Sequence, residues 1–289
     1  MDVSRRALFA ISDLHVGHPA NRELVQALRP ESPGDWLIVA GDVAERMSDV
    51  EWALALLADR FAKVIWAPGN HELWTMPSDP VTSRGEHRYR HLVEVCRSLG
   101  VATPEDAYPV WDGPGGPLVI APLFVLYDYS FRPAGSDTKE EALARAHRAG
   151  VVCTDEALLH PDPYASLDDW CAHRVVETER RLAAVDPALP LVLVNHHPLV
   201  REPTDVLWYP EFALWCGTVR SADWHRRFNV AAVVYGHLHI RRTVWYDDVP
   251  FMEVSVGYPR EWTARVGSLG ADATRPCRVL PLPEVARAR

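Results

Sequence analysis

The sequence predicts an α/β fold, built either as two packed sheets or as one large sheet with helices outside it. Strand-length apolar runs alternate with helix patterns along the chain, and the runs are apolar on both faces, as buried strands are. The chain has 289 residues, of which 48% are hydrophobic and 24% charged, and this fits one large α/β domain. A disordered, collagenous or coiled-coil protein is excluded.

Six strands are expected from short apolar runs rich in β-branched residues. They cover residues 7–12, 36–41, 63–67, 118–125, 191–195 and 230–235.

Three helices have clear boundary signals. Ser48-x-x-Glu51 is a capping box that precedes apolar residues at helical spacing, up to Phe61. Thr138-x-x-Glu141 opens a second helix, which Gly150 ends. A third helix is expected from about residue 86 to residue 99.

The domain is expected to cover residues 1–263. Residues 74–117 and 127–188 are long for simple connections and carry helix patterns, so we expect them to be insertions that cap a site. The tail, residues 264–289, contains Pro and Arg with little periodicity, particularly from Gly267 onward, and is expected to pack poorly.

Charge and cysteine usage limit the partners and the compartment. The net charge is −9, with 30 Lys and Arg against 39 Asp and Glu, which argues against nucleic acid as a partner. The five cysteines form no C-x-x-C pair, which indicates free thiols in a reducing compartment. No apolar run approaches the roughly 18 residues of a membrane helix. A cytoplasmic protein without a membrane partner is therefore expected.

Polar clusters follow five of the six expected strands. In chain order they are Asp13-Leu14-His15, Gly41-Asp42, Gly69-Asn70-His71-Glu72, Asn195-His196-His197-Pro198 and Gly236-His237-Leu238-His239. Ligands of open α/β sheets bind beyond the carboxyl ends of strands, so these clusters are expected to converge. The D-x-H and H-x-H pairs can each turn two side chains to one side, because extended chain has a period of two.

The residue types in these clusters predict a pair of metal ions. Two carboxylates, one amide and four histidines supply oxygen and nitrogen ligands, a set that suits Mn, Fe, Zn or Co. Seven ligands are too many for one tetrahedral ion but suit two ions about 3.5–4 Å apart with a bridging carboxylate. One cluster alone, such as Asp13-x-His15, is as readily structural as functional; the five in order are not.

Taken together, D-x-H, G-D, G-N-H-E, H-x-P and G-H-x-H in this order resemble the motifs of the calcineurin-like metallophosphoesterases. The resemblance implies a two-sheet β-sandwich flanked by helices, and a metal pair of the Mn/Mn or Fe/Mn type, with Zn as an alternative. It implies these ligands: Asp13, His15 and His239 for the first metal, Asn70, His196 and His237 for the second, and Asp42 as the bridge between them.

The same resemblance implies a hydrolase. A phosphate ester would bind the metals, and a metal-bound water would attack phosphorus in line. His71 would point into the pocket and stabilise the transition state or protonate the leaving oxygen; the structural alternative is a hydrogen bond to Glu72 or to backbone. His197 points away from its neighbour His196 and has a packing or supporting role, or else contacts substrate.

Further stretches resemble the phosphopantetheine-releasing members of this family, which act on holo acyl carrier protein. They cover residues 35–45, 61–66, 126–131, 209–212, 214–218, 222–225 and 254–262. Aromatic residues in and beside these stretches would line a groove for the pantetheine arm, with core packing as the alternative for each: Tyr127, Tyr129, Trp208, Tyr209 and Trp215.

Two alternatives to this substrate stay open. One is a phosphodiesterase or phosphatase that acts on cyclic nucleotides or other small phosphoesters. The other is a non-catalytic protein-binding scaffold, which is expected to lose metal ligands, whereas all seven are present here. Carrier proteins are acidic, and arginines at 84, 88, 90, 226, 227, 241 and 242 are candidates for a basic docking surface.

Overall fold

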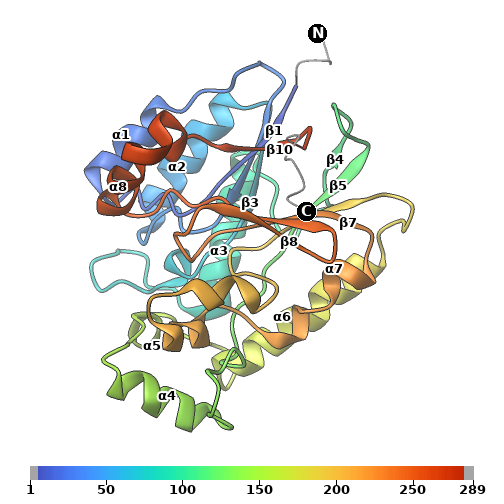
Figure 1. Ribbon diagram of the computed structural model, residues 1–289. Coiled ribbons are helices and arrows are strands. Elements are labelled where there is room, and N and C mark those ends of the chain that lie inside the picture. Colours follow the sequence, from blue (N-terminus) through green and yellow to red (C-terminus); the bar gives the residue numbers. More distant parts are fainter. Residues whose placement is uncertain (1–5, 283–289) are drawn as a thin grey trace.

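The computed structural model describes residues 6–282 and contains two β-sheets packed face to face, with helices outside them (Figure 1). The four-stranded sheet has the order β10 (Cys277–Leu280), β1 (Leu8–Ile11), β2 (Trp36–Ala40) and β3 (Lys63–Ala67). The six-stranded sheet has the order β4 (Val110–Trp111), β5 (Leu118–Pro122), β6 (Leu191–Val194), β7 (Val230–Tyr235), β9 (Val249–Glu253) and β8 (Arg242–Tyr246). The two-sheet α/β fold is confirmed.

Alternate residues of the inner strands enter two different cores. In β1, Leu8 and Ala10 belong to the core between the sheets, whereas Phe9 and Ile11 belong to the core beneath the helices. Both faces of these strands are buried, which explains why they are apolar throughout. All six expected strands are confirmed, although β5 ends at Pro122 and not at residue 125.

The parallel strands bring their carboxyl ends to one edge of the sandwich. β1, β2 and β3 are parallel to one another, and so are β5, β6, β7 and β9. A bridge between Ser12 and Ser255 joins the two sheets at this edge, with the amide of Val256 donating to the Ser12 carbonyl at 2.9 Å.

The described helices are α1 (Pro19–Ala27), α2 (Met47–Arg60), α3 (Gly85–Ser98), α4 (Lys139–Arg148), α5 (Asp155–Leu158), α6 (Leu167–Ala183), α7 (Trp224–Arg227) and α8 (Pro259–Leu269). The capping box of Thr138 and Glu141 is confirmed at α4. The one expected at Ser48 is wrong, because α2 already begins at Met47. The Met47 amide donates to the Asp79 carboxylate at 3.0 Å instead, so a distant loop satisfies this helix end.

The expectation that the tail packs poorly is wrong for β10, which pairs antiparallel with β1 at the edge of the first sheet. The boundary expected at residue 263 falls inside α8, which lies beside α1 and α2 (Figure 1). The Trp262 indole donates to Asn21 at 2.8 Å and so fastens α8 to α1. Residues 283–289 lie outside the described part of the chain.

The two expected insertions carry helices: α3 lies in the first, and α4, α5 and α6 lie in the second. Their role as a cap stays a prediction. Among residues 6–282, no helix has both the length and the apolar character needed to cross a membrane. All five cysteines are free.

Candidate metal centre

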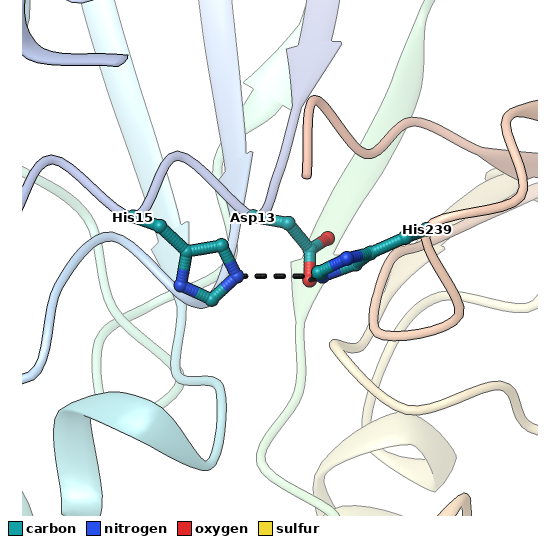
Figure 2. Close-up of side chains that lie close together, drawn as sticks. All are labelled: Asp13, His15 and His239. Carbon is teal, nitrogen blue, oxygen red and sulfur yellow. Dashed lines mark hydrogen bonds and ion pairs between the residues drawn. The ribbon is translucent and has the colours of Figure 1, made fainter. Parts of the chain in front are cut away.

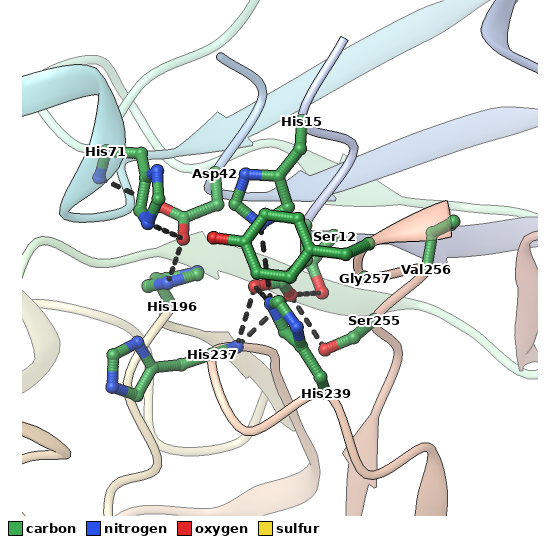
Figure 3. A network of polar contacts seen from close by, with 12 residues as sticks. Ser12, His15, Asp42, His71, His196, His237, His239, Ser255, Val256 and Gly257 are labelled. Atoms are coloured by element: carbon green, nitrogen blue, oxygen red, sulfur yellow. Dashed lines mark hydrogen bonds and ion pairs between the residues drawn. The ribbon is translucent and has the colours of Figure 1, made fainter. Parts of the chain in front are cut away.

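The polar clusters that follow five strands meet in one buried site (Figure 3). Three groups of side chains could hold a metal ion, and in each group the ligand atoms lie within 4.8 Å of one another: Asp13, His15 and His239; His15, Asp42 and His71; and Asp42, His196 and His237. The predicted convergence of residues more than 200 positions apart is thus present in the fold.

Left-handed backbone turns, and not extended chain, direct these side chains. The φ angles are 54° at Asp13, 40° at His15, 54° at Asp42, 72° at His237 and 55° at His239. This conformation is uncommon outside glycine and costs free energy, and such residues gather at functional sites. The expectation that D-x-H and H-x-H act through the period of a strand is therefore wrong, because both pairs follow the strand end and turn within a loop.

The first group surrounds a point where three ligand atoms converge (Figure 2). Nε2 of His239 lies 3.3 Å from Nε2 of His15 and 3.0 Å from Oδ1 of Asp13. The Asp13 carboxylate is itself fixed by the hydroxyls of Ser12 and Ser255, at 2.6 and 2.7 Å. Two ring nitrogens and one carboxylate oxygen are a donor set that fits a transition-metal ion.

Asn70, His196 and His237 each have a buried side-chain atom without a hydrogen-bond partner among the described residues. These atoms are Oδ1 of Asn70, Nε2 of His196 and Nε2 of His237. Buried polar atoms are almost always paired, so unpartnered atoms of this kind call for a ligand. They are the three residues that the resemblance implies for the second metal.

Asp42 lies close to both sets of proposed ligands, as a bridging ligand would. It belongs to two of the three sets, and its Oδ2 lies 3.3 Å from Nε2 of His196 and 3.7 Å from Nε2 of His71. The preceding Gly41 has a φ of 84°, and a Cβ there would lie 2.6 Å from Nδ1 of His196. Only glycine therefore permits this approach.

Acceptors behind two of the histidines fix the ring nitrogen that faces the site. Nδ1 of His196 donates to the Ala40 carbonyl at 2.8 Å, and Nδ1 of His239 donates to the Glu261 carboxylate at 2.7 Å. Because Nδ1 donates in both rings, Nε2 is the nitrogen that faces the site, and it would be the one to bind a metal ion once it has lost its proton.

Buried carboxylates and neighbouring rings set the charges of three histidines in the site. Burial opposes the charged form of His196, but Asp42 and Asp13 outweigh it and raise its pKa to about 10. Burial likewise opposes protonation of His239, yet Asp13 and Glu261 raise its pKa to about 10. Burial and the nearby His196 lower the pKa of His237 to about 3, so this ring is neutral.

His71 lies beside the proposed metal ligands with one ring nitrogen anchored. Its Nδ1 lies 3.0 Å from Glu45, its backbone amide donates to Asp42 at 3.0 Å, and its ring packs on Trp74 with centroids 3.7 Å apart. The alternative partner, the Glu72 side chain, is engaged elsewhere: it accepts from the amides of Asp42, Val43 and Gly69 at 3.0–3.1 Å. Nε2 of His71 is thereby turned toward Asp42.

The aromatic side chains expected to line a groove divide into two sets. Tyr127, Tyr129 and Trp215 are buried, and the last two donate to the same Glu156 oxygen at 2.9 and 2.7 Å, so they belong to the packing. Trp208 is 89% exposed and Tyr209 is 58% exposed. His197 is buried, with its ring 5.2 Å from that of His196 and turned by 84°.

Several site residues escaped the sequence-based prediction. Tyr258 stacks on His15 with centroids 4.5 Å apart, Glu261 accepts from His239, and Asp155 accepts from Asn70 at 2.9 Å. Tyr258 and Glu261 lie in a stretch that resembles the phosphopantetheine-releasing enzymes, but no motif singled them out. Asp155 had no signal at all, because it lies 85 residues from its partner.

Comparison with known protein families identifies a family that agrees with a metal centre at this site. The model of the calcineurin-like phosphoesterase family matches residues 7–241. The chain therefore belongs to this family, whose members use divalent metal ions. The residues assembled here fit such ions in number, donor type and orientation.

Within the family, the chain is similar to one enzyme of Mycobacterium tuberculosis. It is 58% identical over 258 residues to the acyl-carrier-protein phosphodiesterase PptH. The aligned residues cover 89% of this chain and 80% of that protein. The crystal structure of that phosphopantetheinyl hydrolase superposes with a TM-score of 0.94 and 55% identity, over 97% of this chain and 98% of the other.

Proposed function

We propose that this protein is a two-metal phosphodiester hydrolase that removes 4′-phosphopantetheine from the serine of holo acyl carrier protein. The observation that carries the substrate is the similarity to PptH over nearly the whole chain, which extends well beyond the metal motifs. We assign a Mn/Mn or Fe/Mn pair, with Zn as an alternative, because the donors are nitrogen and oxygen without thiolate.

The proposed ligands are those that the geometry brings together. Asp13, His15 and His239 would hold one ion, Asn70, His196 and His237 the other, and Asp42 would touch both. Such a pair lowers the pKa of water toward neutrality and neutralises the oxygens of a phosphodiester.

The protein's own groups supply the remaining proton chemistry. Glu45 holds Nδ1 of His71, so that Nε2 faces the site. Burial opposes the charged form of His71, but Asp42 and Glu45 raise its pKa in the metal-free protein, which favours a protonated ring. This ring would give its Nε2 proton to the serine oxygen as the P–O bond breaks.

The carrier protein has to dock outside the buried centre. Trp208 and Tyr209 are exposed, and Phe212, which follows them, stacks on His237 with centroids 5.9 Å apart. This loop therefore connects the metal centre to the surface, and we assign it to carrier contact.

The arginines proposed for docking are largely engaged within the protein. Arg88 is fully buried and pairs with Asp79 at 3.1 Å, so it is excluded. Arg90 pairs with Glu86 at 2.7 Å, and Arg227 pairs with Glu179 at 2.5 Å.

The test incubates Mn²⁺-loaded protein with holo acyl carrier protein and follows the carrier by intact-mass spectrometry. We expect loss of the phosphopantetheine mass with the native protein and no loss with Asp42→Asn. If the carrier stays intact while bis(p-nitrophenyl) phosphate is cleaved, the metal chemistry stands and the substrate assignment fails. Cyclic nucleotides, tested in parallel, would then identify the small-phosphoester alternative.

A further inference from the structure

Asp155 is a buried carboxylate contributed by the second insertion. It lies at the start of α5, and its side chain is fully shielded from solvent. Its Oδ1 accepts two hydrogen bonds, one from Nδ2 of Asn70 at 2.9 Å and one from Nε1 of Trp74 at 2.6 Å. One oxygen thus holds two residues that both border the metal centre.

The bond to Asn70 determines which end of its amide faces the centre. The Trp74 indole can only donate, so Oδ1 of Asp155 is an acceptor and the NH₂ group of Asn70 faces it. Its Oδ1 therefore faces the other way, where it is buried and has no partner among residues 6–282. An amide turned by 180° would place its NH₂ toward the metal and two oxygens against each other.

The hydrogen bond to Trp74 affects His71, the residue that follows Asn70 in the chain. The Trp74 ring lies against His71 with centroids 3.7 Å apart and an angle of 30° between the rings. The position of this indole therefore limits where the imidazole can move.

Backbone contacts hold α5, and with it Asp155, in place beside the segment that carries Asn70. The amide of Thr75 donates to the carbonyl of Leu158 at 2.9 Å, and Trp74 forms a β-bridge with Leu159. The insertion is thus joined to the chain that carries Asn70, His71 and Trp74.

We propose that Asp155 is a positioning residue for the second metal subsite: it presents Oδ1 of Asn70 to the ion and seats Trp74 behind His71. The inference rests on the proposed two-metal centre. It also gives the second insertion a function, because removal of α5 would release a metal ligand that lies far away in the sequence.

Two substitutions separate the role of Asp155 as a hydrogen-bond acceptor from a role of its negative charge. Asp155→Leu has a side chain of similar size with no acceptor, so the amide of Asn70 loses its partner. Asp155→Asn keeps one oxygen that can accept from Asn70 and Trp74, and its NH₂ would occupy the position of Oδ2, which has no partner among the described residues.

The experiment titrates metal-free protein with Mn²⁺ by calorimetry and follows spin coupling between the two ions by electron paramagnetic resonance. For Asp155→Leu we expect the affinity of one of the two sites to fall about 10- to 100-fold, with loss of the coupled signal. Asp155→Asn is expected to bind both ions within about threefold of the native protein, by the same reasoning.

Two outcomes overturn the inference. One is native affinity for both ions in Asp155→Leu; the other is loss of the second ion in Asp155→Asn, which would mean that the negative charge itself is needed. The second variant keeps the test decisive if Asp155→Leu does not fold. If the native protein itself binds no pair of ions, the proposed function fails, and this result is distinct from either outcome.

Discussion

Nδ1 of His71 lies 3.0 Å from Oε1 of Glu45, and the same carboxylate oxygen lies 3.6 Å from Nδ1 of His15. Glu45 thus stands behind one proposed catalytic residue and one proposed metal ligand. It anchors the ring of His71 by a hydrogen bond and lies close to the ring of His15 without bonding it.

His71→Ala is expected to lower kcat by roughly 10²- to 10⁴-fold, because it removes a proton donor to the leaving oxygen. Metal content, measured by inductively coupled plasma mass spectrometry, is expected to stay at the native value. Glu45→Gln retains a polar partner for the ring and is expected to have a smaller effect on kcat. Loss of a metal ion from His71→Ala would place His71 among the ligands instead.

Metal binding is expected to release protons. His196 and His239 both have a pKa of about 10 in the metal-free site, so both rings are protonated at pH 7 and must lose a proton to bind metal. Binding of the ion pair at pH 7 is then expected to release about two protons from these rings. Because the pKa values are raised, metal affinity rises as the pH increases from 7 toward 10.

Calorimetric titration in buffers of different ionisation enthalpy measures this proton release directly. Binding that is independent of both buffer and pH would show that the two rings are neutral before the metal enters, and would contradict the pairing with Asp13 and Asp42.

Glu261→Ala is expected to weaken the first metal site. Nδ1 of His239 loses its acceptor, and removing such a partner of a ligand histidine costs about 10- to 100-fold in metal affinity. Glu261→Gln serves as the matched control, since its amide oxygen can still accept from the ring. Equal losses in the two variants would indicate that the start of α8, and not the ring orientation, is what matters.

Trp208→Ala tests the docking loop. Truncation of a buried interface tryptophan commonly costs more than 1 kcal/mol, so KM for holo acyl carrier protein is expected to rise about 10-fold. Cleavage of bis(p-nitrophenyl) phosphate is expected to remain unchanged, because Trp208 is 89% exposed. An unchanged KM for the carrier would remove Trp208 from the contact surface.

The predicted ligands could be recognised because each follows a strand whose pattern is visible in the sequence. Burial on both faces makes β1, β2, β3, β6 and β7 continuously apolar, and the polar residues after them stand out. What the sequence does not reveal is the backbone conformation. Asp13 and His15 adopt left-handed φ angles that no pattern in the sequence marks.

The missed elements lack that pattern. β8 alternates between exposed and half-buried residues, β9 contains Pro250 and ends at Glu253, and β10 is a short edge strand with Arg278 in its middle. Supporting residues are harder still to predict, because Asp155 and Glu261 act through contacts that only the folded chain creates.

The most direct test of the two-metal centre is anomalous diffraction from crystals of the protein grown with Mn²⁺. We expect two manganese peaks, one bounded by Asp13, His15 and His239 and the other by Asn70, His196 and His237, with Asp42 in contact with both. A single peak, or a pair of peaks with other ligands, would contradict it.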